Sequence, residues 1–336
     1  MGLDPMLNST HSADPWKKEL FGRLDRIRVD CGMLCQLNSV EDIEKNTIEV
    51  PEANFDRIEV PNVNCPALLS MEELDAGDLH TPGIPEELYD FFTIGGVVHV
   101  TGHQRRRDIY LGTASEKGLW PTGNIWEEKD IEDIIVNASL GTLKGSYGVD
   151  STTRVRDKLK SAQIRGKSIL VIGSSHPWLE AILLSLGAKQ VTTLEYGEII
   201  SHHPKIKTLT PSQFREDYKS GLLEMFDGVV THSSIEHSGL GRYGDALTPW
   251  GDILAIARAW CSTRDGGFLY LGVPTGKEAI FSNWHRVYGK LRYPLVTINW
   301  RSLDKTDESE LELGIWKSQA HGGFGYLFEK VGKSQF

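Results

Sequence analysis

The stretch from Ser168 to Glu198 constrains the fold more than any other part of this sequence. It begins with Ser168–Ile172, a short apolar run typical of a strand buried on both faces. A turn at Gly173 follows, and then apolar residues recur at helical spacing from Trp178 to Ser185. Gln190–Leu194 has strand composition again. A strand, a turn, a helix and a second strand in this order predict two parallel strands joined by a helix.

The same alternation continues towards the C-terminus. We expect further strands at 205–209, 226–231 and 267–273, and helices at 211–223 and 252–261. Two last segments, 295–300 and 324–329, are expected to close the sheet as an antiparallel pair. The pattern therefore predicts an α/β fold with a doubly wound, mostly parallel sheet.

Composition divides the chain into three predicted segments. Residues 1–85 are polar and acidic, and their prolines break long helices, so we expect an irregular N-terminal extension that wraps the core. Residues 86–150 are expected to form a small α+β substructure packed on the core, with a strand near 95–101 and a helix at 126–138. Residues 151–336 carry the predicted sheet.

Net charge bears on the class of partner. The chain has a formal net charge of −10, and its acidic residues are concentrated in the first 150 positions. Nucleic-acid binding needs a cationic face, so we expect no nucleic-acid partner. No apolar run reaches the length of a membrane span, and we expect none in this chain. A small molecule or a glycan is the expected partner, and the sequence leaves the oligomeric state open.

Four cysteines and two glycosylation sequons bear on the cellular compartment. Cys31, Cys35 and Cys65 fall in one segment where a disulfide can form, whereas Cys261 lies in a helical pattern and is predicted to be a buried thiol. The sequons begin at Asn8 and Asn137. No signal peptide is visible, but the first six residues look foreign to a native start. Together these features slightly favour the secretory lumen, such as the Golgi, over the cytoplasm.

Three turns are expected to meet at one edge of the sheet. Ligands of doubly wound sheets bind beyond the carboxyl ends of the strands, and each turn follows such an end. Glu195 lies about twenty residues beyond the first turn, where a carboxylate can accept both hydroxyls of a ribose. The candidate cofactor-binding residues are therefore Gly173, Ser174, Ser175, His176, Glu195, Tyr196, Ser233 and Ser234.

This arrangement resembles the class I S-adenosylmethionine-dependent methyltransferases over roughly residues 150–335. The first turn of that family usually has an acid followed by three alternating glycines. Here Val171 takes the place of the acid, Gly173 matches, and Ser175 and Pro177 replace the other two glycines. Glu195 matches the ribose-binding acid. The resemblance implies a Rossmann-like methyltransferase fold and S-adenosylmethionine as cofactor, with the acid at Val171 missing.

A narrower resemblance is to a family defined by a domain of unknown function, known from nematodes, plants and some bacteria. It rests on the segments 171–178, 226–245 and 283–289, of which the second is long and specific. Membership implies a methyltransferase-like fold and leaves the substrate open.

The loop after the predicted strand at 226–231 is the best candidate for chemistry. Methyl transfer to a hydroxyl needs the acceptor oxygen held near the methyl carbon and its proton removed. His237 is the candidate base, because an imidazole titrates near neutral pH. Glu236 and Asp245 are expected to orient it or to serve as the base instead. His285 lies in a second segment expected at the same edge.

The segment Trp284–Tyr288 favours a sugar acceptor, since aromatic rings stack on sugar faces and charged groups bind hydroxyls. Ordinary core packing with one surface arginine explains the same residues about equally well. The sequence thus predicts an S-adenosylmethionine-dependent O-methyltransferase acting on a hydroxyl, with a glycan sugar as the candidate acceptor. Two alternatives stay open: a non-catalytic binding protein on a degenerate fold, and a metal-dependent hydrolase using His232 and His237. Their spacing does not fit the zincin or inverted-zincin motifs, and we assign no metal ligands.

Overall fold

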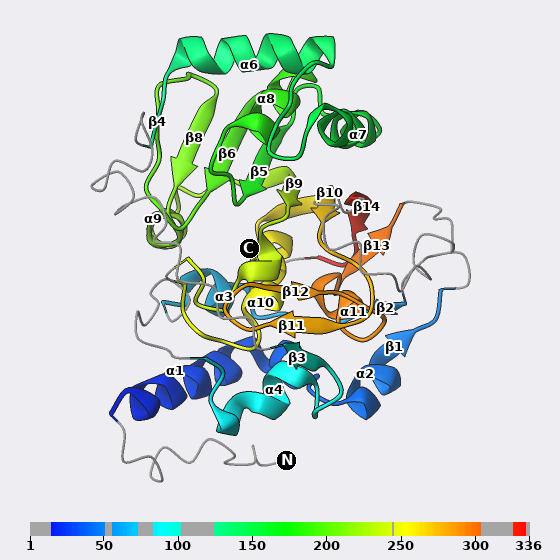
Figure 1. Ribbon diagram of the computed structural model, residues 1–336. Coiled ribbons are helices and arrows are strands. Elements are labelled where there is room, and N and C mark those ends of the chain that lie inside the picture. The colour runs from blue at the N-terminus through cyan, green and yellow to red at the C-terminus, as the bar shows by residue number, and fades with distance from the viewer. Residues whose placement is uncertain are drawn as a thin grey trace.

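The computed structural model describes residues 15–50, 56–72, 83–101, 124–243, 245–303 and 325–333. Its centre is a seven-stranded sheet in the order β13-β14-β10-β9-β5-β6-β8 (Figure 1). These strands are β5 (Ser168–Ile172), β6 (Gln190–Leu194), β8 (Ile206–Leu209), β9 (Phe226–His232), β10 (Thr263–Gly272), β13 (Trp300–Ser302) and β14 (Gly325–Lys330). The neighbours from β8 to β10 pair in parallel, whereas β14 is antiparallel to β10 and to β13. The predicted α/β class with a mostly parallel sheet is confirmed.

Helices cover both faces of this sheet. Val171 and Val230 lie in one apolar core together with residues of α7 and α8. Leu170 and Val229 lie in a second core together with residues of α9 and α10. Adjacent residues of a strand point to opposite faces, so the two cores flank the sheet. The helices of these layers are α6 (Glu128–Leu140), which packs on α8, α7 (Val149–Lys160), α8 (Trp178–Ser185), α9 (Pro211–Lys219) and α10 (Gly251–Cys261) (Figure 1).

The N-terminal segment departs from the prediction. The expected irregular extension is wrong for α1 (Pro15–Cys31), a helix that buries one apolar stripe. Leu20, Leu24 and Ile27 of this stripe are three and four residues apart, the spacing of one helix face. They join the same core as α10. The charged residues between them hid this stripe, because they make the segment polar on average.

The remaining elements are short and tie the N-terminal segments to the sheet. They are α2 (Val40–Asn46), α3 (Cys65–Ser70), α4 (Tyr89–Thr93), α11 (Tyr293–Val296), the 3-10 turns η1 (Gly32–Cys35), η2 (Glu86–Leu88) and η3 (Ile235–His237), and the strands β1 (Thr47–Ile48), β2 (Arg57–Ile58), β3 (His99–Thr101), β4 (Ile125–Trp126), β7 (Ile200–Ser201), β11 (Ala279–Phe281) and β12 (His285–Val287). β3 pairs with β11 and β4 pairs with β7, so strands of the 86–150 segment complete small sheets with later strands.

Several predicted boundaries differ, and two of the differences have a clear physical reason. The helix expected at 211–223 ends at Lys219, because Gly221 has a φ of +68° that a helix cannot continue through. The closing antiparallel pair forms, but its first strand begins only at Trp300. The residues before it form α11, whose Pro294 stands at the start of the helix, where proline is favourable.

A disulfide between Cys65 of α3 and Cys261 of α10 joins the N-terminal segment to the sheet domain, with their Cα atoms 5.4 Å apart. The prediction of a free buried thiol at Cys261 is wrong, because α3 packs on α10 and brings Cys65 beside it. A second disulfide links Cys31 and Cys35. In the part of the chain that the structure describes, no helix is long and apolar enough to cross a membrane.

Candidate functional site

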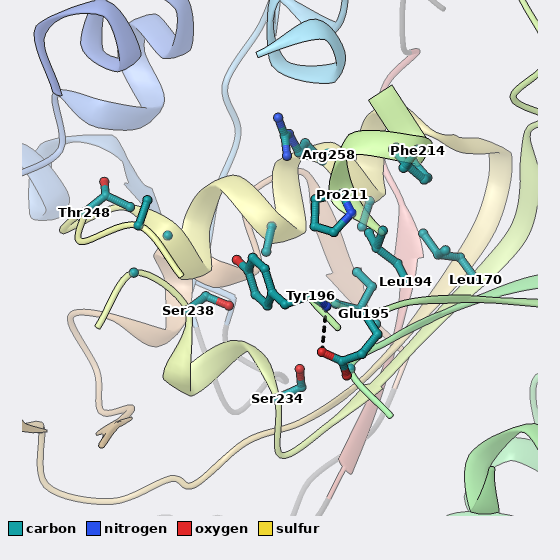
Figure 2. Close-up of a pocket in the computed structure, with 17 residues that line it drawn as sticks. Leu170, Leu194, Glu195, Tyr196, Pro211, Phe214, Ser234, Ser238, Thr248 and Arg258 are labelled. Atoms are coloured by element: carbon teal, nitrogen blue, oxygen red, sulfur yellow. Dashed lines mark hydrogen bonds between the residues drawn. The ribbon is translucent and has the colours of Figure 1, made fainter. Parts of the chain in front are cut away.

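A cavity lies beyond the carboxyl ends of β5, β6 and β9, between α9 and α10 (Figure 2). Counted along the chain, the parallel strands lie in the order 3-2-1-4-5, so the order reverses between β5 and β9. Ligands of open α/β sheets bind at this reversal. The cavity walls are mainly apolar and include Leu170, Leu194, Pro211, Phe214 and Ala255. Of the predicted cofactor residues, Gly173, Glu195, Tyr196 and Ser234 line it.

Gly173 brings the turns after β5 and β9 into contact. Its φ of +76° lies in the left-handed region that favours glycine. A Cβ atom on this residue would lie 1.8 Å from Ser234 Oγ and 2.4 Å from Ser234 Cβ. The first turn of the site therefore needs glycine here for both its backbone conformation and the close approach of Ser234.

Glu195 holds the first turn from the end of β6. Its Oε2 accepts the Ser174 backbone N–H at 2.9 Å, and its Oε1 accepts the Tyr196 N–H at 2.7 Å. The residue is 7% exposed. Figure 2 shows the Glu195 carboxylate beside Ser234, with the Tyr196 ring reaching towards Ser238. The predicted ribose-binding acid thus lies at the cavity and also positions the turn.

Ser175 and His176 lie on the outer side of the turn. The Ser175 hydroxyl is 3.1 Å from His176 Nδ1, and His176 is exposed. Neither residue lines the cavity. A role in contacting a cofactor stays a prediction for both.

Glu236 has the surroundings of a general base. The residue is 1% exposed, and its Oε1 accepts a hydrogen bond from Ser233 Oγ at 2.7 Å. Among the described residues, its buried Oε2 has no hydrogen-bond partner. Burial raises the pKa of the Glu236 carboxyl to about 7. A base is most effective when its pKa lies near the working pH, so this carboxylate suits proton removal.

His237 is neutral and weakly basic in its surroundings. Its Nδ1 donates to the Trp284 carbonyl at 2.5 Å, which leaves Nε2 as the ring nitrogen that can accept. Arg242 Nη1 lies 3.1 Å from Nδ1 and 3.4 Å from Nε2. Burial, and then the nearby Arg242 charge, lower the pKa of His237 to about 3. An imidazole with this pKa accepts a proton poorly near pH 7. The structure therefore favours Glu236 over His237 among the predicted bases.

Asp245 organises the loop after β9. Its Oδ2 accepts the N–H groups of Gly239 and Gly241 at 2.7 and 3.0 Å, and its Oδ1 accepts that of Tyr243 at 3.1 Å. Three backbone amides therefore use this buried carboxylate, which holds the loop, and its predicted role beside His237 stays a prediction. His285 lies with its ring 6.2 Å from that of His237, so the second predicted segment does reach this loop.

A buried ion cluster that the sequence did not indicate fixes the same loop. Arg286 is fully buried, so the surface arginine of the alternative core-packing interpretation is wrong. It donates from Nη1 to the Ser238 carbonyl at 2.5 Å. Asp252 accepts bidentate hydrogen bonds from Arg292, at 2.9 and 2.7 Å, and one from the Tyr288 hydroxyl at 3.0 Å. These partners are more than thirty residues apart in sequence, so no local pattern could indicate them.

His232 and His237, the two histidines of the metal hypothesis, have different surroundings. The His232 ring packs against Tyr147, Trp178 and Tyr270, and burial lowers its pKa to about 4. Within the described ranges, no group of three or more His, Cys, Asp or Glu side chains could hold a metal ion. The metal-dependent hydrolase therefore gains no support from the described residues.

Comparisons with known proteins give one sequence match. Residues 166–322, a little under half of the chain, match the family model "Caenorhabditis protein of unknown function, DUF268". The match confirms the narrower predicted resemblance for this segment, which contains Glu195 and the loop after β9. No curated protein matches the chain.

Several solved structures are similar to part of the chain. A Lactococcus lactis protein described as a hemolysin is 20% identical, with a TM-score of 0.26, over 35% of this chain and 55% of its own. A Streptococcus mutans protein described as a SAM-dependent methyltransferase is 10% identical, with a TM-score of 0.32, over 54% and 49%. The Burkholderia thailandensis 1,6-didemethyltoxoflavin-N1-methyltransferase, solved with S-adenosylhomocysteine, is 11% identical, with a TM-score of 0.36, over 70% and 94%. The first two matches span only about half of those proteins, and likenesses this distant do not bear on activity.

Proposed function

We propose that this protein is an S-adenosylmethionine-dependent methyltransferase whose cofactor occupies the cavity beyond β5, β6 and β9. The observation that carries this proposal is Glu195, a buried carboxylate at the end of β6 on the wall of an otherwise apolar cavity. An adenosine group has the matching chemistry. Its ribose hydroxyls can donate to a carboxylate, and its flat base can pack on apolar side chains such as Leu194 and Phe214.

The missing acid at Val171 does not weaken this fit. Val171 lies in the core that includes α7 and α8, whereas its neighbours Leu170 and Ile172 line the cavity. Because adjacent strand residues point to opposite faces, a carboxylate at this position would point away from the cavity. S-adenosylmethionine, when bound, would supply an electrophilic methyl group, and the residues of the chain would hold it and remove the acceptor proton.

We further propose that the acceptor is a hydroxyl and that Glu236 removes its proton. The bare Oε2 of Glu236 supports this role. Glu236 does not itself line the cavity, but it lies two residues beyond Ser234, which does. A glycan sugar is the proposed acceptor. The ring of Trp284 lies 4.5 Å from that of His285, and both residues are partly exposed, so they offer an aromatic surface for a sugar face.

A non-catalytic binding protein is the second candidate. Both oxygens of Glu195 already accept backbone N–H groups, and the turn keeps only one of the three family glycines. In this case Glu195 would serve the fold alone, and the cavity would take no cofactor.

Calorimetric titration with S-adenosylhomocysteine separates the two candidates. We expect the wild-type protein to bind, and Glu195→Gln to bind about 10–100-fold more weakly, because hydrogen bonds to a charged group contribute roughly 1.5–3 kcal/mol. Glu127→Gln is the matched control, since Glu127 pairs with His202 at 2.9 Å on the surface and does not line the cavity. Absence of binding by the wild-type protein would favour the non-catalytic candidate.

We also propose a location in the secretory lumen. All four cysteines lie in disulfides, which persist in oxidising compartments, and Asn137 of the second sequon is exposed on α6. A count of free thiols on protein purified from the native cell tests this, and four reactive thiols would contradict it.

A further inference from the structure

Glu180 is a buried carboxyl that the proposed chemistry leaves unused. It lies in the first turn of α8 and has no exposed surface. Its Oε1 accepts a hydrogen bond from Thr193 Oγ1 at 2.7 Å, and its Oε2 lies 3.0 Å from Ser174 Oγ. Ser174 is the residue whose backbone N–H is held by Glu195. Glu180 and Glu195 therefore contact the first turn of the candidate site through the same serine.

The single hydrogen of the Ser174 hydroxyl indicates the protonation state of the Glu180 carboxyl. The Ser174 hydroxyl is 2.7 Å from the His176 carbonyl oxygen as well as 3.0 Å from Glu180 Oε2. A hydroxyl has one hydrogen, and a carbonyl oxygen and an ionised carboxylate are both acceptors. Both contacts become hydrogen bonds only when Glu180 itself carries a proton. Glu180 then donates to Ser174 Oγ, and Ser174 donates to His176.

We propose that Glu180 is a positioning residue that holds the cofactor turn in its binding shape while it is a neutral carboxylic acid. Loss of its proton would draw the Ser174 hydroxyl away from the His176 carbonyl and would place a second negative charge near Glu195. The turn would then loosen, and cofactor affinity would fall as the pH rises. The expected change in cofactor affinity rests on the proposed function.

The surroundings of Glu180 agree with a neutral acid. Burial, opposed by the hydrogen bond from Thr193, raises the pKa of its carboxyl to about 7, and the Glu195 charge adds to the increase. On the elements packed against α8, the described residues of the surrounding core are apolar, among them Ala138 of α6, Val155 of α7 and Val171 of β5. Titratable groups near this helix among the described residues include Glu195, His176 in the turn, and His232, whose ring lies 5.5 Å from that of Trp178 in α8.

Calorimetric titration of S-adenosylhomocysteine between pH 6 and pH 9 tests the proposal. For the wild-type protein, we expect the affinity to fall by up to about tenfold per pH unit above pH 7, because one proton is lost. Glu180→Gln should keep the pH 6 affinity at every pH, since an amide donates to Ser174 Oγ and accepts from Thr193 Oγ1 without titrating. The proposal would be overturned if the affinity of Glu180→Gln fell with pH as steeply as that of the wild-type protein. It would also be overturned if Glu180→Gln bound weakly already at pH 6.

A second measurement needs no cofactor and separates this proposal from the proposed function. The folded pKa of Glu180 is raised above its unfolded value of 4.5, so the folded state binds the extra proton and stability falls as the pH rises from 4.5 to 7. Glutamine does not titrate. The denaturation midpoint of the wild-type protein should therefore fall relative to that of Glu180→Gln over this range. If the two midpoints change in the same way with pH, a neutral Glu180 is contradicted. If the midpoints differ as expected but the protein does not bind S-adenosylhomocysteine, only the proposed cofactor site is contradicted.

Discussion

Glu236→Gln is expected to lower kcat by about 100–10,000-fold and to leave S-adenosylhomocysteine affinity unchanged, because a positioned general base contributes a factor of this size. Glutamine has the shape of glutamate and keeps an oxygen that can accept from Ser233 Oγ, so the loop after β9 should stay in place. The assay follows the transfer of a labelled methyl group from S-adenosylmethionine to oligosaccharides released from glycoproteins. The wild-type kcat should rise with pH and level off above about pH 7, where Glu236 is ionised.

A stability measurement distinguishes this loss from simple damage to the fold. The folded pKa of Glu236 is about 7 against 4.5 for an unperturbed carboxyl, so the wild-type protein loses stability as the pH rises through this range. Glu236→Gln should therefore be as stable as the wild-type protein or more stable at pH 8, although it is inactive. His237→Gln serves as the comparison, because His237 is the other predicted base. Activity within threefold of wild type in Glu236→Gln, with activity lost in His237→Gln, would assign the base to His237.

Gly173→Ala is expected to lower the free energy of unfolding by about 2–5 kcal/mol and to abolish S-adenosylhomocysteine binding. About 1–2 kcal/mol comes from placing a side chain in the left-handed region, and about 1–3 kcal/mol from the collision with Ser234. The collision cannot be relieved without separating the turns after β5 and β9. Denaturant titration measures the stability, and calorimetry measures the binding.

Gly166→Ala is the matched control for backbone strain. Gly166 has a φ of +78°, close to the +76° of Gly173, but a Cβ atom there would meet nothing within 4 Å. It should show only the cost of the left-handed conformation. Adding Ser234→Gly to Gly173→Ala removes the nearest atoms. The double variant should recover the part of the unfolding free energy that the collision with Ser234 costs. Equal effects of the two alanine variants would mean that the close approach of the turns does not matter.

The elements that the sequence predicted well are those whose signal is local. β5 and β6 have the predicted limits because a short apolar run bounded by turn residues indicates a buried strand. Glu195 was found for a related reason, since a carboxylate at the end of the second strand reaches the edge where ligands bind. The cavity contains this residue, as the pattern indicated.

What could not be predicted depends on contacts between distant segments. Asp252 and Arg292 are forty residues apart, and the Cys65–Cys261 disulfide spans 196. The pKa of His237 is lowered by its burial and by Arg242, and a sequence motif shows neither effect. Glu180 is the one charged residue of α8, but its partners Ser174 and Thr193 become visible only in the fold.

A crystal structure of the protein with S-adenosylhomocysteine tests the central claim most directly. We predict the ligand in the cavity between α9 and α10, with its ribose hydroxyls within hydrogen-bond distance of the Glu195 carboxylate and its base against Leu194 and Phe214. A cavity that stays empty at a saturating ligand concentration, or a ligand bound away from Glu195, would contradict the assignment of this site.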